Sequence, residues 1–198
     1  MCQVTTTREI RVQIVPDTDA PDPTVEFDHL GTIVSWHRRY QIGPRHGWSS
    51  PADFLADTQG RAIILPLYLY DHTVLRLSTQ PWTGRAPHAE WDSGQVGYIY
   101  VPLDRVRQEY GVRRVTRRIR DQVMAVLAAE VDTYSHYLNG DVYGYIVEAV
   151  DRCPCGRETV TVVDSCWGFY GWDPMTNGMA EAIAPDYVDA LKAACDVA

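Results

Sequence analysis

The sequence predicts one globular α+β domain over residues 1–198, with a mainly antiparallel sheet of about seven strands, one long helix and two or three shorter helices. Two observations predict this fold class. Strand-like apolar segments follow one another across short polar turns instead of alternating with crossover helices, which favours antiparallel pairing. A stripe of apolar residues at helical spacing runs through residues 116–138. The length of 198 residues and the 45% hydrophobic content suit one domain with its own core.

The strands are predicted from alternation and from turn residues. Residues 8–15 alternate between apolar and polar side chains, as a half-buried strand does. Residues 61–70 and 74–78 flank a short polar turn and predict a hairpin, in which Pro66 requires a sheet edge or a bulge. The predicted strands are residues 8–15, 30–36, 61–70, 74–78, 96–101, 142–150 and 159–167.

The long helix is predicted from its apolar stripe, and Asn139-Gly140 ends it with residues that tolerate left-handed dihedral angles. The stripe consists of Ile119, Val123, Leu127, Val131, Tyr134 and Leu138. The shorter helices are predicted over residues 51–57, 102–110 and 185–197.

The charge is unevenly distributed along the chain. The whole chain has a formal charge of −8, but residues 1–120 sum to +2 and residues 121–198 to −10. The acidic part repels nucleic acid and would attract a basic protein. A local basic island with seven arginines, Arg105 to Arg120, has two interpretations: a solvated helix face, or a patch that binds nucleic acid or an acidic partner.

The five cysteines are an odd number, which argues against a complete disulfide framework. The sequence has no apolar run long enough to span a membrane and no signal-peptide core after Met1. We therefore expect a cytoplasmic protein with reduced thiols and no membrane partner. Zinc is not favoured, because only one residue separates Cys153 from Cys155 and Cys166 has no second cysteine beside it.

Three aspartates precede a glycine and an aromatic residue near predicted strands: Asp92, Asp141 and Asp164. One interpretation is architectural, with aspartates in turns and glycines that let a large ring lie across the backbone. The other is that the three carboxylates converge and bind a divalent cation. In that case they are candidate catalytic residues, together with His37.

A cluster of polar residues follows the second predicted strand. His37, Arg38, Arg39 and Tyr40 stand together there, and arginine side chains bind anions well. We predict Arg38, Arg39 and Tyr40 as ligand- or anion-binding residues. The dipeptide Asp71-His72 does not by itself form a catalytic pair, because neighbouring strand residues point to opposite faces.

The common nucleotide-binding and hydrolase motifs are absent from the sequence. The missing patterns are GxxxxGK[ST], GxGxxG, HExxH and GxSxG. No organic cofactor is therefore expected, and a divalent cation belongs only to the three-aspartate hypothesis.

Five stretches together resemble a family of small, functionally uncharacterised proteins encoded by bacteriophages and other mobile elements. They are FDHLGTIVSWHRRY (27–40), ILPLYLYD (64–71), WDSGQVGYIYV (91–101), YLNGDVYGYIVE (137–148) and DSCWGFYG (164–171). The resemblance covers most of residues 25–180. It implies an accessory gene expressed in the cytoplasm of a bacterial host, and it brings no catalytic residues with it.

These observations favour a binding protein over an enzyme. We expect it to engage a host protein, such as a defence system, through an acidic or aromatic surface. One alternative is an enzyme acting on a nucleotide or nucleic acid, with the three aspartates on Mg²⁺ and His37 to Arg39 on phosphate. Another is a ligand sponge, which holds a signalling nucleotide in a pocket lined by tyrosine and arginine. The oligomeric state is left open.

Overall fold

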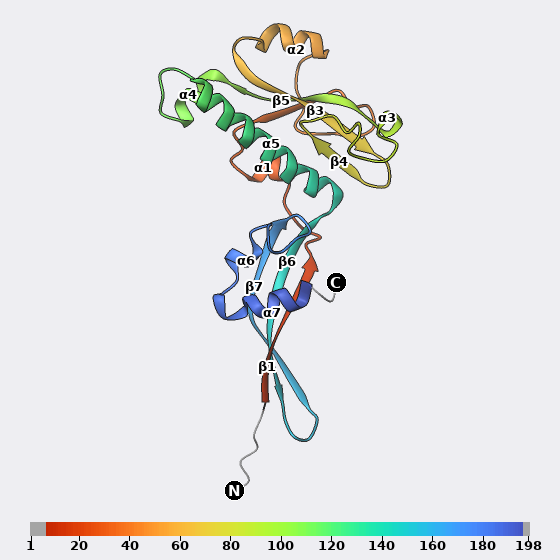
Figure 1. The fold of residues 1–198 in the computed structure, drawn as a ribbon, viewed down its shortest axis with the longest axis vertical. Helices are drawn as coiled ribbons and strands as arrows, with labels where there is room; N and C mark the ends of the chain where they lie inside the picture. Colours follow the sequence, from red (N-terminus) through yellow and green to blue (C-terminus); the bar gives the residue numbers. More distant parts are fainter. Residues whose placement is uncertain (1–6, 196–198) are drawn as a thin grey trace. The chain divides into compact units, whose positions relative to one another are not determined.

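A computed structural model describes residues 7–195 and divides the chain into two compact units (Figure 1). Unit 1 comprises Met1–Ala20 and Gly140–Ala198, and unit 2 comprises Pro21–Asn139. Unit 2 is therefore an insertion between the two chain segments of unit 1. A compact unit need not fold independently, so the single domain over residues 1–198 stays a prediction.

The α+β class, the antiparallel pairing and the long helix are confirmed, but the expectation of one sheet is wrong. The described residues form a three-stranded sheet in the order β1-β6-β7 and a four-stranded sheet in the order β2-β5-β3-β4. Each sheet belongs to a different unit. Apolar alternation reveals where a strand lies but not which strand it pairs with, so it could not separate the two sheets.

The four-stranded sheet is the centre of unit 2. It consists of β2 (Thr32–Ser35), β5 (Ser93–Pro102), β3 (Ala62–Asp71) and β4 (Leu75–Ser78). Pro66 lies where β3 pairs with β5 but not with β4, next to a bulge at Leu67/Tyr68, as its missing N–H requires.

One face of this sheet packs on the long helix α5 (Arg117–Asn139). The predicted apolar stripe is its buried face, and Gly140 ends it with a φ of 74°. The core of unit 2 consists of Leu30, Ile33, Ile42, Ile63, Leu67, Leu69, Leu77, Ile99, Val101, Val106, Val123, Leu127, Val131 and Tyr134.

The opposite face carries aromatic side chains under the predicted helix α2 (Pro51–Thr58). Phe54 of this helix is fully buried and lies 5.3 Å from the ring of Tyr98 and 5.1 Å from that of Tyr100. Burial, and then the Asp57 carboxylate, raises the pKa of Tyr100, so this phenol stays neutral in the layer. The sheet of unit 2 is thus covered on both faces.

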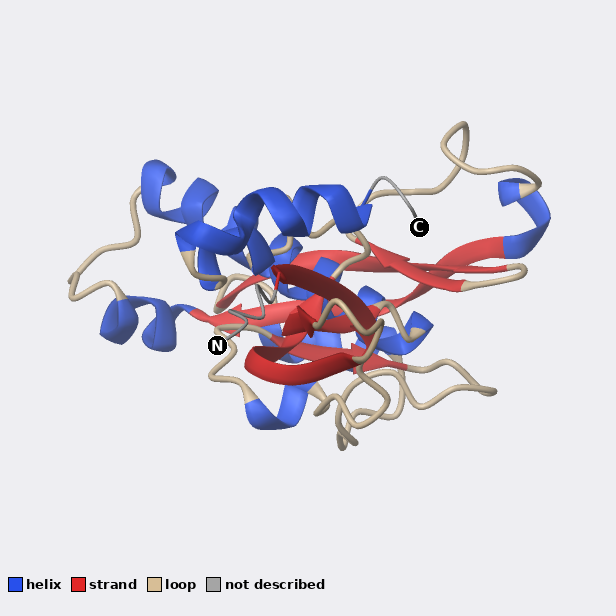
Figure 2. Ribbon diagram, turned by 90° about the horizontal axis from the view of Figure 1, so that it is seen from below, coloured by secondary structure: helices blue, strands red, loops and turns tan. Residues whose placement is uncertain are grey.

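Three short helices complete unit 2: α1 (Pro23–Glu26), α3 (Ala89–Asp92) and α4 (Leu103–Glu109). Only α4 is predicted, because one turn of helix carries too few residues to show periodicity. Long loops join several of these elements to the strands, as the tan segments of Figure 2 show.

Unit 1 has β1 (Thr7–Pro16), β6 (Val142–Arg152) and β7 (Glu158–Tyr170), with β6 in the middle. Its helical segments are α6 (Met179–Ala182), η1 (Pro185–Tyr187) and α7 (Val188–Cys195). The predicted helix over residues 185–197 corresponds to η1 and α7, and its last two residues lie outside the described residues. The core of unit 1 consists of Val12, Tyr145, Val147, Met179, Ile183 and Leu191.

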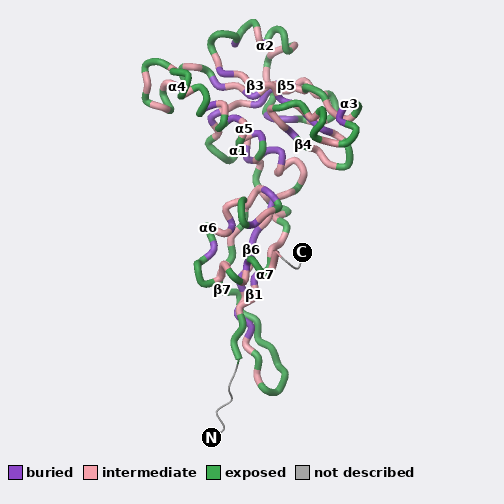
Figure 3. The backbone as a smooth tube through the Cα atoms, in the orientation of Figure 1, coloured by how far each residue is buried: buried purple, intermediate pink, exposed green. Residues whose placement is uncertain are grey.

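The edge strand β7 is largely exposed, as Figure 3 shows for the hairpin it forms with β6. Val160, Val162 and Trp167 are 47%, 59% and 48% exposed. Trp167 lies across Gly144 of β6, where a Cβ would stand 2.4 Å from the indole. The sequence predicted this arrangement, in which a strand glycine leaves room for a large ring to lie across the backbone.

The tip of the β6–β7 hairpin corrects the expectation of reduced thiols. Cys153 and Cys155 form a disulfide, with Cα atoms 5.2 Å apart, while Cys166 is a free thiol. The turn brings the two side chains to the same side, a proximity that spacing alone did not reveal. In the disulfide neither sulfur is a thiolate that could bind zinc. Among residues 7–195, no helix combines the length and the apolar content that crossing a bilayer requires.

Candidate functional site

Three chain segments meet at one end of the unit 2 sheet. β5 lies between β2 and β3 and is antiparallel to both, so β2 and β3 end where β5 begins. The pairs Ser35↔Gly97 and Tyr70↔Ser93 fix this arrangement. The residues that follow β2 and β3 and those that start β5 therefore lie together, and we call this region the strand-end site.

His37 occupies the centre of the site with a defined orientation. Its Nδ1 accepts a hydrogen bond from the backbone N–H of Tyr40 at 3.1 Å, and its ring stacks on the Tyr40 ring at 5.1 Å. An Nδ1 that accepts carries no proton, so the neutral ring bears its proton on Nε2. The neutral His37 ring therefore has its hydrogen-bond donor at Nε2.

Arg39 and Tyr40 are tied to the end of β3. The Arg39 guanidinium lies 3.4 Å from one oxygen of Asp71, and the Tyr40 hydroxyl donates to the other oxygen at 3.3 Å. Arg39 also lies over the Tyr40 ring, 5.0 Å from its centre. Arg38, by contrast, is exposed and forms no ion pair among the described residues. Arg38 is thus a cation of this site whose charge no carboxylate among the described residues neutralises.

A histidine–carboxylate pair lies at the same end of the sheet. Nδ1 of His72 is 2.9 Å from Oδ2 of Asp92, so the carboxylate orients the ring and leaves Nε2 for other contacts. His88 lies close by, with ring centres 6.0 Å apart, and has a φ of 53°. Among the described residues no other non-glycine residue has a positive φ, and such backbone conformations cluster at functional sites.

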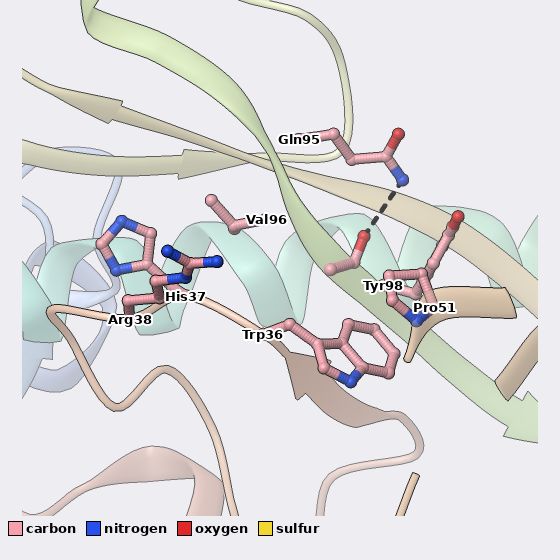
Figure 4. Close-up of a pocket in the computed structure, with 8 residues that line it drawn as sticks. Trp36, His37, Arg38, Pro51, Gln95, Val96 and Tyr98 are labelled. Atoms are coloured by element: carbon pink, nitrogen blue, oxygen red, sulfur yellow. Dashed lines mark hydrogen bonds between the residues drawn. The ribbon is translucent and has the colours of Figure 1, made fainter. Parts of the chain in front are cut away.

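A hollow of about 470 Å³ opens on the aromatic side of the sheet (Figure 4). Figure 4 shows His37 and Arg38 on one side of it and the rings of Trp36 and Tyr98 on the other. The Trp36 indole N–H donates to the Trp48 carbonyl at 3.1 Å, which fixes the ring. This volume lies within the range of small-molecule sites, about 300–1,000 Å³.

Two more hollows also include His37 in their walls. One of about 420 Å³ is lined by Arg39, Asp71, Trp91 and Asp92, and the other, of about 320 Å³, lies along residues 40–46. His37 is thus accessible from several directions, as a ligand-contacting residue must be.

The strand-end site brings together five of the residues that the sequence singled out: His37, Arg38, Arg39, Tyr40 and Asp92. It adds residues that sequence reasoning did not assign: Trp36, His72, Trp91, Gln95 and Tyr98. The missing step was strand order, because residues 37–40, 71–72 and 91–98 are adjacent only once β5 is placed between β2 and β3.

The other two candidate aspartates belong to unit 1. Asp164 accepts a hydrogen bond from the Tyr145 hydroxyl at 3.2 Å. Burial of Tyr145, and then the Asp164 carboxylate, raises the pKa of that phenol to about 12. The backbone carbonyl of Asp141 accepts from Gly171 at 2.9 Å, at the end of the β6–β7 ladder.

A cation site built from all three aspartates is not assembled within either unit. Among residues 7–195, no group of three or more histidine, cysteine, aspartate or glutamate side chains is arranged to hold a metal ion.

The basic island spans α4 and the first turns of α5. Arg105 pairs with Asp28, and Arg107 pairs with Asp104. The other five arginines of the island are exposed and form no ion pair in the described part of the chain: Arg113, Arg114, Arg117, Arg118 and Arg120. Both interpretations of the island stay open.

A comparison with known proteins finds no matching protein family, no matching curated protein and no matching solved structure. The function of the strand-end site is therefore argued from its own residues and geometry.

Proposed function

We propose that the protein acts by binding, and that the strand-end site of unit 2 holds a small anionic ligand with an aromatic ring. One observation carries this proposal: His37 has a fixed orientation and lines several hollows, next to the fixed indole of Trp36 and to Arg38, which has no ion pair among the described residues. Aromatic surfaces with a few well-placed polar groups are typical of small-molecule sites. This is the ligand-sponge alternative of the sequence analysis, with a specific location.

Binding without turnover is favoured because the site lacks an activated nucleophile. The hydroxyl of Ser93, which lines the 420 Å³ hollow, donates to the Ala89 carbonyl at 2.6 Å and so is not paired with a base. The histidine–carboxylate pair His72–Asp92 then serves to hold the start of β5 at the end of β3, and to present a ring nitrogen to the ligand.

The test is to incubate the purified protein with a panel of nucleotides, separate bound from free ligand, and identify both by mass spectrometry. A sponge returns the ligand unchanged, whereas an enzyme returns a product. Arg38→Ala should weaken retention, and Arg61→Ala is the matched control, because that exposed arginine precedes β3 at the opposite end of the strand. Equal retention by both variants, or no retention by the unmodified protein, would contradict the proposal.

A second candidate function is the binding of a bacterial host protein by unit 1. It is favoured by the surface of that unit, which is acidic overall and exposes Trp172 at 71% together with the apolar side chains of β7. The resemblance to phage and mobile-element proteins supports a partner in the host cytoplasm, such as a defence protein. A pull-down from host lysate at low and moderate salt tests it. A stoichiometric partner that Val162→Lys releases would support it, and no partner at either salt concentration would count against it.

A further inference from the structure

Residues 113–120, which read RRVTRRIR, carry five positive charges and no negative one. We call them the arginine segment. The segment follows α4 and includes the first turn of α5 (Figure 1). Its five arginines are exposed, and none of them has an ion pair among the described residues. A charge of this density without compensating carboxylates attracts anions.

The two apolar residues of the arginine segment hold its backbone in place. Val115 and Ile119 are partly buried against the core of unit 2. Thr116 begins the helix: its hydroxyl accepts a hydrogen bond from the N–H of Ile119 at 3.4 Å, and its carbonyl accepts one from the N–H of Arg120 at 3.0 Å. The exposed arginines therefore stand on an ordered backbone, so that binding does not have to pay for ordering a loop.

The position of these charges is unfavourable for helix α5 itself. The free N–H groups at a helix N-terminus carry a partial positive charge, which stabilises acidic side chains there and destabilises basic ones. The first turn of α5 contains no acidic residue and begins with Arg117 and Arg118. Arg117 and Arg120 are also three residues apart, where like charges on a helix repel each other. A solvated surface gives no reason for this arrangement, whereas a bound anion would neutralise both the arginines and the helix terminus.

The number and the surroundings of the charges favour a nucleic-acid duplex as the anion. A small anion cannot neutralise five guanidinium groups, whereas a duplex presents about one phosphate charge per 1.7 Å of its length. Arginine binds phosphate oxygens through paired hydrogen bonds. A single strand would also need exposed aromatic rings on which its bases could stack. Tyr110, the one aromatic residue of the basic island, instead packs partly buried against the core of unit 2.

We propose that the arginine segment binds the phosphate backbone of a nucleic-acid duplex without reading its sequence. Contacts to phosphates position a protein on a duplex and carry no direct base information. The segment and the strand-end site lie toward opposite ends of β5, because Ser93 starts β5 in that site and Pro102 ends β5 directly before α4. This surface is therefore a second one, and it does not depend on the proposed function.

Fluorescence anisotropy of a labelled DNA duplex, titrated with the full chain at several salt concentrations, tests the proposal. Five phosphate contacts correspond to a slope of about −4.5 for the logarithm of the binding constant against that of the salt concentration. The affinity should then fall about 500-fold for a fourfold increase in salt. Arg117→Glu should weaken binding at least tenfold at low salt and reduce the slope by about 1.

Arg76→Glu is the matched control, because it changes the net charge of the chain by the same amount. Arg76 is an exposed residue of β4, and the N–H of the next residue, Leu77, donates to Ser135 near the end of α5. Ser135 lies about 27 Å from Arg117 along the helix axis. The control variant should therefore bind the duplex with an affinity within about twofold of that of the unmodified protein.

Thermal unfolding shows whether weaker binding comes from a damaged fold. Arg117→Glu should raise the melting temperature by about 1–4 °C, because it places an acidic side chain at the helix N-terminus. Arg113→Glu, which lies before the helix, should weaken binding without altering α5. Equal affinities of Arg117→Glu and Arg76→Glu, or no salt-dependent binding of the duplex, would overturn the proposal. Tighter binding of single-stranded DNA would also overturn it, as would tighter binding of poly-glutamate, which would indicate an acidic protein as the partner.

Discussion

Unit 1 and unit 2 are both antiparallel sheets with helices packed on them, but they differ in charge and in what their sheets leave exposed. Unit 2 has 13 acidic and 13 basic side chains, whereas unit 1 has 13 acidic and 5 basic, so unit 1 accounts for the whole formal charge of −8. The sheet of unit 2 is covered by α5 and by the aromatic layer. The sheet of unit 1 exposes the apolar side chains of β7.

The difference shows how strand order creates a site. In unit 2 a strand inserted between two antiparallel neighbours gathers three chain segments at one end, and oriented groups such as His37 result. In unit 1 each pair of neighbouring strands is also antiparallel, but the outer strand β7 pairs with no further strand among the described residues. An exposed strand edge is a template for pairing with another chain. Four predictions test this contrast.

The largest expected effect comes from separating the units. Each buried cluster lies within a single unit, so a fragment of residues 21–139 should retain the core of unit 2 and unfold cooperatively. Circular dichroism during urea titration measures this. A fragment without a cooperative transition would show that unit 2 depends on unit 1, as the single-domain prediction implies.

Matched core truncations should act locally. Leu127→Ala in unit 2 and Leu191→Ala in unit 1 each remove a fully buried leucine and should cost about 2–5 kcal/mol. Hydrogen exchange followed by mass spectrometry should show faster exchange in the unit that carries the substitution. Val126→Ala, at a 38% exposed position of α5, is the control and should change stability by less than about 1 kcal/mol. Uniformly faster exchange in both leucine variants would argue for one cooperative domain.

Alkaline pH should destabilise unit 1. Burial, and then the Asp164 carboxylate, raises the pKa of Tyr145 to about 12 in the folded protein, above the ordinary tyrosine value of 10.0. Because the folded state holds this proton more tightly, its stabilising contribution is complete below pH 10 and disappears as the pH rises to 12. The loss amounts to about 2–3 kcal/mol. Denaturant titrations across this range measure it, and Tyr145→Phe should reduce the pH dependence by that amount. If the unfolding free energy of the variant fell with pH as steeply as that of the unmodified protein, Tyr145 would not be the cause of the pH dependence.

Two glycines on β5 give the smallest and most local comparison. A Cβ at Gly97 would lie 2.0 Å from the backbone oxygen of Val34, so Gly97→Ala should push β2 from β5 and cost about 1–3 kcal/mol. Nothing lies within 4 Å of a Cβ at Gly94, and Gly94→Ala should change stability by less than about 0.5 kcal/mol. Thermal unfolding gives the melting temperatures of the Gly97→Ala and Gly94→Ala variants for comparison. Similar melting temperatures would mean that β2 and β5 are not paired so closely.

The sequence predicted the elements better than their assembly. The long helix and all seven strands are recognisable from local periodicity, since each side-chain pattern reflects which face is buried. The two sheets, the inserted unit and the helices α1, α3 and α6 were not predicted, because pairing between distant strands and single helical turns have no local pattern.

The candidate site was predicted only in part, again because pairing between distant strands leaves no local pattern in the sequence. The segment of His37 to Tyr40 is conspicuous in composition, and it does line the hollows. The pair His72–Asp92 was missed because its members are 20 positions apart and meet only through the pairing of β3 with β5. The three aspartates looked alike in sequence, yet they are divided between the units.

The central claim is that the strand-end site of unit 2 is the ligand-binding centre of the protein. Titration of the ¹⁵N-labelled full chain with the members of the nucleotide panel, followed by two-dimensional NMR, tests it most directly. The account predicts that the amide signals that shift belong to residues 36–40, 71–72 and 91–98, and that Arg38→Ala suppresses these shifts. Unchanged spectra, or shifts confined to unit 1, would contradict the claim.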